Sequence, residues 1–161
     1  MIVDIEISVD SQSLKGFSKS GELLFETQVA TAKNGVGQQE GSECTPLGSH
    51  RIRAKIGGDE PLNSVFVGRR TTGEIYNLEL GKQFPKRDWI LTRILWLCGN
   101  QPGFNRGGKL DTQRRYIYIH GAPDTHPMGI PSSHGCIKMR NKDIIALFDL
   151  VAVGTTVKIS H

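Results

Sequence analysis

Two short segments decide the fold and the chemistry of this chain: Tyr116-Ile117-Tyr118-Ile119-His120-Gly121 and, after the loop 122–132, Ser133-His134-Gly135-Cys136. The regular alternation in the first segment predicts a strand over residues 115–120. A strand places Tyr116, Tyr118 and His120 on one face and the two isoleucines on the other. If the isoleucines face the core, His120 faces a site and Tyr118 lies beside it.

The cysteine of the second segment has the sequence surroundings of a nucleophile. A cysteine attacks a carbonyl as its thiolate, and a free thiol, with a pKa of about 8.5, is mostly protonated at neutral pH. An imidazole within reach can take this proton and later return it to a leaving group, and His120 and His134 are the two candidates. Gly135 allows a substrate carbonyl to approach the backbone, where amide N–H groups can hold an oxyanion. These residues predict covalent catalysis by Cys136.

The two segments resemble the catalytic signature of the L,D-transpeptidase (YkuD) family. In that signature a strand ends in His-Gly, and a loop with an internal glycine, here Gly129, leads to Ser-His-Gly-Cys. The stretch Thr45-Pro46-Leu47-Gly48 is similar to a second motif of the family, and Ser11-Gln12-Ser13-Leu14 to a weaker third one. The resemblance extends from about residue 2 to residue 159. It implies a mainly β fold, a YkuD-like β-sandwich or flattened barrel with one packed α-helix.

The resemblance implies roles for the catalytic residues. Cys136 would be the nucleophile, and His120 the general base, with its other ring nitrogen held by the backbone carbonyl of Gly121. The amide groups of residues 134–136 would form the oxyanion hole. Ser133 and His134 would shape the pocket.

Substrate binding is expected from Tyr118, Gly129 and Lys138. The family usually has Arg or Asn at the position of Lys138, and Lys keeps the positive charge without the planar fork of Arg. Ala122 stands where relatives often have Thr. His126, in the loop that follows, is expected to be solvated or to line the pocket.

The implied reaction is acyl transfer on a peptidoglycan tetrapeptide stem. Cys136 would attack the carbonyl of the third residue and expel the terminal D-Ala, leaving a thioester. Water as the acceptor gives an L,D-carboxypeptidase that trims muropeptides, and an amine from a second stem gives an L,D-transpeptidase that forms 3→3 cross-links. No metal or organic cofactor is expected, and carbapenem-type inhibitors are expected to acylate the thiol.

Two other interpretations use the same residues. His120, His126, His134 and Cys136 are possible zinc ligands, but the spacing of the last two is too short for the usual zinc motifs. A non-catalytic module that binds peptidoglycan or a metal is the alternative from another class. In that case a Cys136→Ser variant would keep its function.

Composition and cysteine content bear on partners and location. The formal net charge is +4, and the stretch 82–115 carries eight basic residues against two acidic ones. No nucleic-acid motif accompanies them, so we expect a solvated face or attraction of an anionic substrate, and no nucleic-acid partner. Cys44 and Cys98 are expected to be buried and unpaired, and free thiols are typical of a reducing compartment.

The N-terminal stretch has no features of an export signal, and no apolar run is long enough to span a membrane. We therefore expect a cytoplasmic protein without a membrane partner, and prefer the carboxypeptidase that trims recycled muropeptides. The alternative is a periplasmic enzyme whose signal has been removed.

The pattern along the chain predicts one domain, 1–161. Strands are expected at 2–8, 14–18, 23–31, 49–56, 64–68, 74–78, 90–97, 115–120 and 155–160, with loops at 36–44 and 99–111. Asn141 is expected to cap one helix that presents Ile144, Ile145, Leu147, Phe148 and Val151 to the core and ends at Gly154. His50 and His161 are expected at the surface.

Overall fold

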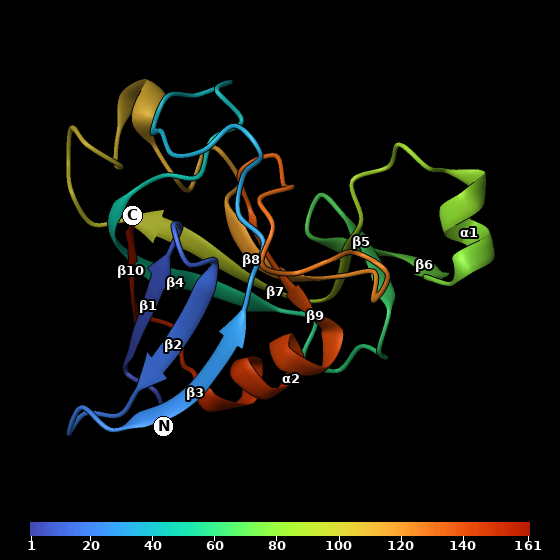
Figure 1. Ribbon diagram of the computed structural model, residues 1–161, viewed down its shortest axis with the longest axis horizontal. Helices are drawn as coiled ribbons and strands as arrows, with labels where there is room; N and C mark the ends of the chain where they lie inside the picture. Colours follow the sequence, from blue (N-terminus) through green and yellow to red (C-terminus); the bar gives the residue numbers. More distant parts are fainter.

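The computed structural model describes residues 1–161 and consists mainly of β-strands, with two α-helices and one 3-10 helix (Figure 1). The elements, in chain order, are β1 (Asp4–Ser8), β2 (Ser13–Phe17), β3 (Leu23–Gln28), β4 (Gly48–Ile56), β5 (Ser64–Val67), β6 (Arg70–Ile75), α1 (Leu78–Gln83), β7 (Ile90–Gly99), η1 (Gly108–Leu110), β8 (Tyr118–Ala122), β9 (Ile137–Arg140), α2 (Asn141–Leu150) and β10 (Thr156–Ser160).

The strands form one curled sheet in the order β3-β2-β1-β10-β4-β7-β5-β6, and β8 pairs with β7 outside this path. Strand β1 pairs in parallel with β10, so the two ends of the chain meet in the middle of the sheet. Strand β8 runs antiparallel to β7 and parallel to β9. The predicted mainly β fold with one packed helix is confirmed, and the sheet takes the form of a half-barrel.

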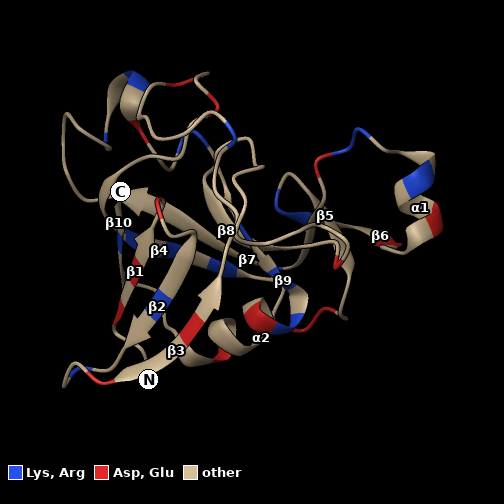
Figure 2. Cartoon of the chain, viewed as in Figure 1, with Lys and Arg blue, Asp and Glu red and all other residues tan.

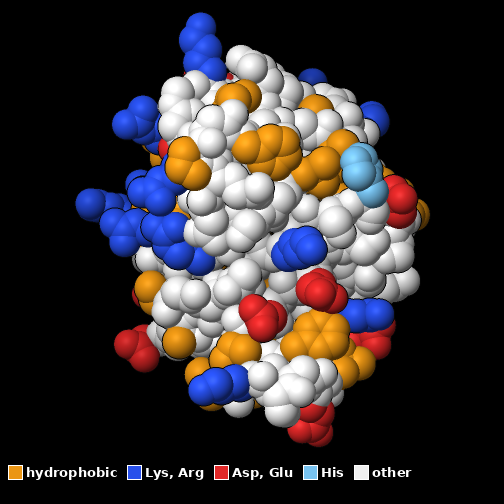
Figure 3. Space-filling model, turned by 90° about the vertical axis from the view of Figure 1, so that its left-hand side faces the viewer, with side chains coloured by type: hydrophobic (Ala, Val, Ile, Leu, Met, Phe, Trp, Pro, Cys, Tyr) orange, Lys and Arg blue, Asp and Glu red, His pale blue; other side chains and the backbone are white.

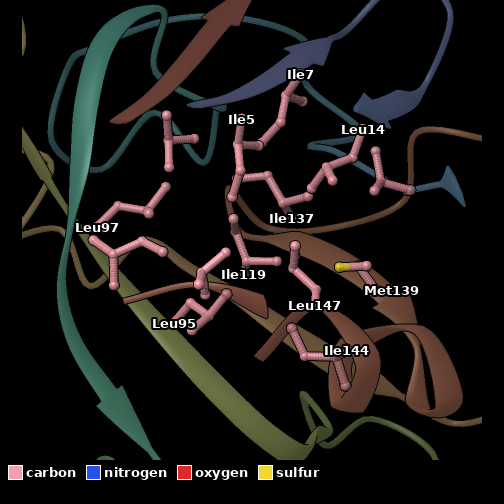
Figure 4. Packing of buried hydrophobic residues seen from close by; sticks show 14 of the residues in the cluster. Ile5, Ile7, Leu14, Leu95, Leu97, Ile119, Ile137, Met139, Ile144 and Leu147 are labelled. Atoms are coloured by element: carbon pink, nitrogen blue, oxygen red, sulfur yellow. The ribbon is translucent and has the colours of Figure 1, made fainter. Parts of the chain in front are cut away.

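Strands β8 and β9 turn one face to the core, and the opposite face of β8 reaches the site. Ile119 of β8 and its register partner Ile137 of β9 belong to a cluster of 18 buried apolar residues, which Ile144 and Leu147 of α2 complete (Figure 4). Burying a side chain of this size contributes about 1.5–3 kcal/mol. Because side chains alternate along a strand, His120 points away from this cluster.

Helix α2 packs against β7, β8 and β9, but it begins differently from the prediction. Ile144, Leu147 and Phe148 are buried as expected, whereas Ile145 is half-buried. Arg140 is the N-cap residue and makes no capping hydrogen bond through its side chain. Asn141 is the first helical residue, because its amide group is bonded to the side chains of Thr92 and Asn63 instead of to the helix end. The helix ends at Leu150, before Gly154.

Two further expectations about secondary structure were wrong, and one strand was missed. The strand expected at 74–78 is β6, at Arg70–Ile75, and the chain then forms α1, whose start is capped by the Asn77 side chain. The strand expected at 115–120 starts only at Tyr118, because Tyr116 adopts a left-handed φ of 57°. Strand β9 was not predicted at all.

Two residues lie elsewhere than their sequence suggested. His50 was expected at the surface but is fully buried, with its Nε2 atom 2.9 Å from the Thr112 hydroxyl and its Nδ1 atom 3.0 Å from the carbonyl of Gly48. Cys44 was expected to be buried but is partly exposed, whereas Cys98 is buried as predicted.

The loops around 36–44 and 99–111 are largely irregular, as expected, and they lie side by side (Figure 1). The amide of Glu40 donates to the carbonyl of Lys109 at 2.7 Å, which joins the first loop to η1. Arg115 ties the first loop to the segment before β8 through bonds to the carbonyls of Gly37 and Gln38.

The basic stretch 82–115 does not form one surface. It runs from α1 at one end of the molecule to η1 at the other, with β7 between them (Figure 2). At the end of the molecule that carries β1 and β10, Lys and Arg side chains gather along one edge (Figure 3). Neither α-helix has the length and apolar composition that crossing a bilayer requires.

Candidate active site

A cavity of about 510 Å³ lies where β8, the end of the β5–β6 hairpin and the segment 133–136 meet. Five of the predicted site residues line it, namely Tyr118, His120, Ser133, His134 and Cys136. The lining also includes four residues that sequence reasoning did not place there, namely Arg69, Asp88, Ile90 and Arg115. Segments far apart in the chain therefore form one site around the predicted nucleophile.

The Cys136 thiol is held between two backbone groups. Its Sγ atom lies 3.4 Å from the carbonyl oxygen of Tyr116 and accepts the amide N–H of Tyr118 at 3.3 Å. Burial raises the pKa of the Cys136 thiol to about 12, and the nearby Asp88 carboxylate adds to this rise. The bond from Tyr118 and the Arg115 charge act in the opposite direction. The predicted nucleophile is therefore a neutral thiol at neutral pH.

His120 is oriented as a neutral base. It is buried on β8, and its Nδ1 atom lies 2.7 Å from the carbonyl oxygen of Gly121. Because a carbonyl only accepts hydrogen bonds, Nδ1 carries the proton and Nε2 of the neutral ring has a free lone pair. Burial lowers the pKa of His120, with the Lys138 charge acting in the same direction and the Gly121 carbonyl and Asp88 opposing it. The imidazole is thus unprotonated at neutral pH and ready to accept a proton.

Gly121 lets β8 pass close to its neighbours. A Cβ atom at this position would lie 2.5 Å from the Asn141 side-chain oxygen and 2.6 Å from the carbonyl oxygen of Leu91. The Asn141 oxygen in turn accepts the hydroxyl of Thr92, which adopts a left-handed φ of 75° in the irregular part of β7. The glycine after His120 is therefore required by packing, and this packing fixes the carbonyl that orients the imidazole.

The backbone of the Ser-His-Gly-Cys segment is held by side chains. The Ser133 hydroxyl donates to the carbonyl of Cys136 and accepts the amide of Gly135 at 3.2 Å. The amides of His134 and Cys136 have no acceptor within the protein. Two of the three amides predicted for an oxyanion hole are therefore free, and the third is occupied.

Thr45 anchors the same segment from the other side. Its hydroxyl donates to the carbonyl of Gly135 at 2.9 Å and accepts the amide of Ala32 at 3.0 Å. Since the C=O and N–H groups of a trans peptide point in opposite directions, fixing the Gly135 carbonyl also fixes the direction of the Cys136 N–H group. Gly135 has a φ of 131°, which favours glycine, and a Cβ atom there would lie 3.2 Å from the Cys44 carbonyl.

Besides Gly121 and Gly135, three other predicted residues do not line the cavity. Lys138 is the register partner of His120 on β9 and is 8% exposed, and burial lowers its pKa. Gly129 forms a turn with a φ of 87° and donates its amide to the carbonyl of Val29. His126 is half-buried, and its Nδ1 atom has no hydrogen-bond partner. Substrate binding by Gly129 and Lys138 stays a prediction.

Sequence reasoning missed Arg69 and Asp88 entirely as site residues. Arg69 comes from the tip of the β5–β6 hairpin, and Asp88 from the segment before β7, where its carboxylate lies 3.9 Å from Nδ1 of His134. No local pattern marked either residue. No three His, Cys, Asp or Glu side chains come together as a metal site anywhere in the chain.

Comparison with known proteins agrees with the fold and with the sequence signature. The profile of the YkuD family, described as the L,D-transpeptidase catalytic domain, matches residues 3–159. The probable L,D-transpeptidase YbiS of Escherichia coli is 46% identical over 44 residues, which are 27% of this chain and 14% of that protein. The probable L,D-transpeptidase ErfK/SrfK of Salmonella typhimurium is 49% identical over 45 residues, 28% of this chain and 15% of that protein.

Solved structures share the fold over almost the whole chain. A mutant of the Enterococcus faecium L,D-transpeptidase aligns with 99% of this chain and 50% of its own at a TM-score of 0.58 and 16% identity. L,D-transpeptidase 3 from Mycobacterium tuberculosis, solved with a faropenem-derived adduct, aligns with 99% of this chain and 60% of its own, also at a TM-score of 0.58 and 16% identity. The chain thus spans about half the length of these structures and matches about a seventh of the curated relatives.

Proposed function

Because the chain belongs to the YkuD family of L,D-transpeptidase catalytic domains, we propose that it is a cysteine acyltransferase acting on the tetrapeptide stems of peptidoglycan. In this proposal the enzyme releases the terminal D-Ala and passes the remaining acyl group mainly to water, as an L,D-carboxypeptidase. The observation that carries the proposal is the shared cavity of Cys136 and His120, in which the imidazole presents an unprotonated Nε2.

The first half of the reaction forms a thioester. The Cys136 sulfur attacks the carbonyl of the third stem residue while Nε2 of His120 takes the thiol proton. The N–H groups of His134 and Cys136 stabilise the negative charge that develops on the carbonyl oxygen. When the intermediate collapses, the C–N bond breaks, and the imidazolium returns the proton to the amine of the departing D-Ala.

The second half transfers the acyl group. Water attacks the thioester as His120 accepts one of its protons, the C–S bond breaks, and the proton returns to the sulfur. The products are a tripeptide stem and the neutral thiol. A neutral resting pair is suited to this cycle, because the base is free before each attack and charge separates only in the transition state.

The charges of the cavity favour water as the acceptor. The lining carries two guanidinium groups, Arg69 and Arg115, against one carboxylate, Asp88. An acceptor amine is an ammonium ion at neutral pH, so the excess positive charge opposes its approach, whereas water is unaffected. The relatives, however, bear the name L,D-transpeptidase, so cross-linking through an amine is the second candidate function.

Mass spectrometry of a purified disaccharide tetrapeptide after incubation with the protein tests the proposal. We expect loss of D-Ala with addition of water, and no change in product when an acceptor amine is added in excess. A product joined to the amine would instead establish transpeptidation. Cys136→Ser should abolish D-Ala release and Cys98→Ser should retain it, because the Cys98 thiol is buried outside the cavity. No release by the unmodified protein would refute the proposed substrate.

A further inference from the structure

Arg69 occupies an unusual backbone position at the edge of the cavity. Val67 and Arg70 pair across the β5–β6 hairpin, which leaves Gly68 and Arg69 as a two-residue turn. Their φ angles are 58° and 65°. Turns with both angles positive favour Gly, Asn and Asp, and a long side chain in the left-handed region carries strain. Such strain tends to persist where a side chain has a function.

The Arg69 side chain is held in place by three aromatic residues. Its guanidinium lies over the Trp96 ring, 4.3 Å from the centroid, and 5.1 Å from the centroid of Tyr116. One N–H group donates to the Tyr118 hydroxyl at 3.1 Å. Stacking of this kind fixes the plane of the guanidinium and leaves its edge accessible.

The rest of this guanidinium has no partner in the protein. Arg69 forms no ion pair, and its bond to Tyr118 is its one side-chain hydrogen bond. The other arginine of the cavity, Arg115, differs, since it is bonded to the carbonyls of Gly37, Gln38 and Cys44. Of the two positive groups in the lining, Arg69 is therefore the one free to bind an anion.

The geometry points to Arg69 as the residue that binds the free carboxylate of the terminal D-Ala of the substrate. This inference rests on the proposed function and names what selects its substrate. A planar guanidinium with a free edge binds a carboxylate through two parallel hydrogen bonds. Arg69 would then select stems that end one residue beyond the bond that is cleaved.

A single residue, Tyr118, contacts both the nucleophile and Arg69. The Tyr118 amide donates to Sγ of Cys136, and the hydroxyl of the same Tyr118 meets Arg69, so one tyrosine side chain spans the gap between nucleophile and guanidinium. The terminal carboxylate lies one residue beyond the scissile carbonyl, a span of about 3.5 Å. Of the carboxylates that a stem can carry, this one lies next to the bond that is cleaved.

Kinetics with two matched substrates test the inference. The substrates are the tetrapeptide stem with a free terminal carboxylate and the same stem with a terminal amide, and release of D-Ala or D-alaninamide gives kcat/KM for each. A charge-assisted pair predicts that the unmodified enzyme prefers the acid by about 10- to 100-fold. Arg69→Gln should lose this preference by slowing on the acid alone. Arg69→Lys should retain part of it, because the charge remains without the fork.

The neighbouring exposed Arg70 provides the control. Arg70→Gln removes the same charge from the same hairpin and should behave as the unmodified enzyme. If kcat/KM of Arg69→Gln falls equally for the acid and the amide substrate, the inference is contradicted, and Arg69 serves packing or binds another carboxylate. An unmodified enzyme that cleaves both substrates equally would contradict it too and leave the proposed function intact. An enzyme inactive on both would refute the proposed function and the inference with it.

Discussion

Replacing Thr45 by valine tests the link between the fold and the proposed oxyanion hole. The two side chains have nearly the same shape, so the change removes a hydroxyl that donates to Gly135 and accepts from Ala32. Thr45 is fully buried, and each buried group left without a partner costs about 1–3 kcal/mol. The sum, about 2–6 kcal/mol, corresponds to a fall in Tm of roughly 5–20 °C for a chain of this length.

Activity should fall as well, because the freed Gly135 carbonyl no longer fixes the direction of the Cys136 N–H group. We expect kcat to decrease by at least about tenfold. Complete loss of an oxyanion donor typically costs about 100-fold or more. Thr45→Ser is the matched control, since it keeps the hydroxyl and loses one methyl group, worth about 1 kcal/mol. Circular dichroism melting and D-Ala release measure the two effects. If the valine and serine variants melt at the same temperature and turn over equally, the reasoning is wrong.

Two further changes probe the buried histidine and the glycine of β8. Burial lowers the pKa of His50 to about 4. The contribution of His50 to folding stability is therefore fully present above pH 6.5, where His50 is neutral in the unfolded chain too, and this contribution is lost as the pH falls towards 4. The free energy of unfolding, measured with urea, should fall by about 3 kcal/mol between pH 6.5 and pH 4 for this reason. If the unfolding free energy of His50→Gln falls equally over this pH range, His50 is not the source of the loss. Gly121→Ala forces a Cβ atom against Asn141 and a backbone carbonyl, so we expect about 1–3 kcal/mol of destabilisation and loss of D-Ala release through displacement of His120. Gly58→Ala, whose Cβ atom would lie 3.3 Å from the Phe148 ring and meet no backbone atom, should cost less, and equal effects of the two substitutions would contradict the packing argument.

Most strands of the central sheet could be predicted because the sequence pattern that indicates each strand is local. The strand expected at 90–97 was identified correctly as β7, although burial along it does not alternate regularly. The candidate nucleophile and base were found because Cys136 and His120 lie in short motifs whose chemistry is visible in the residues themselves. The Gly121 carbonyl lies against Nδ1 of His120 at 2.7 Å, as the resemblance implied.

The features that escaped prediction depend on contacts between distant segments. Strand β9 is defined by parallel pairing with β8, which no local alternation indicates. Helix α1 has no buried residue, so it has no apolar stripe to recognise. Asn141 had the sequence context of a helix cap, but bonds to Thr92 and Asn63 determine its place. Arg69 reaches Tyr118 from 49 positions away in the chain, and only the hairpin geometry brings them together.

Covalent capture of the nucleophile tests the central claim most directly. The protein, with Cys136→Ala and Cys98→Ser as matched variants, would be incubated with a carbapenem and analysed by intact-mass spectrometry and peptide mapping. Attack by a cysteine activated by His120 predicts one adduct, located on Cys136, in the unmodified protein and in Cys98→Ser, and no adduct in Cys136→Ala. An adduct that persists in Cys136→Ala, or its absence from the unmodified protein, would contradict the account.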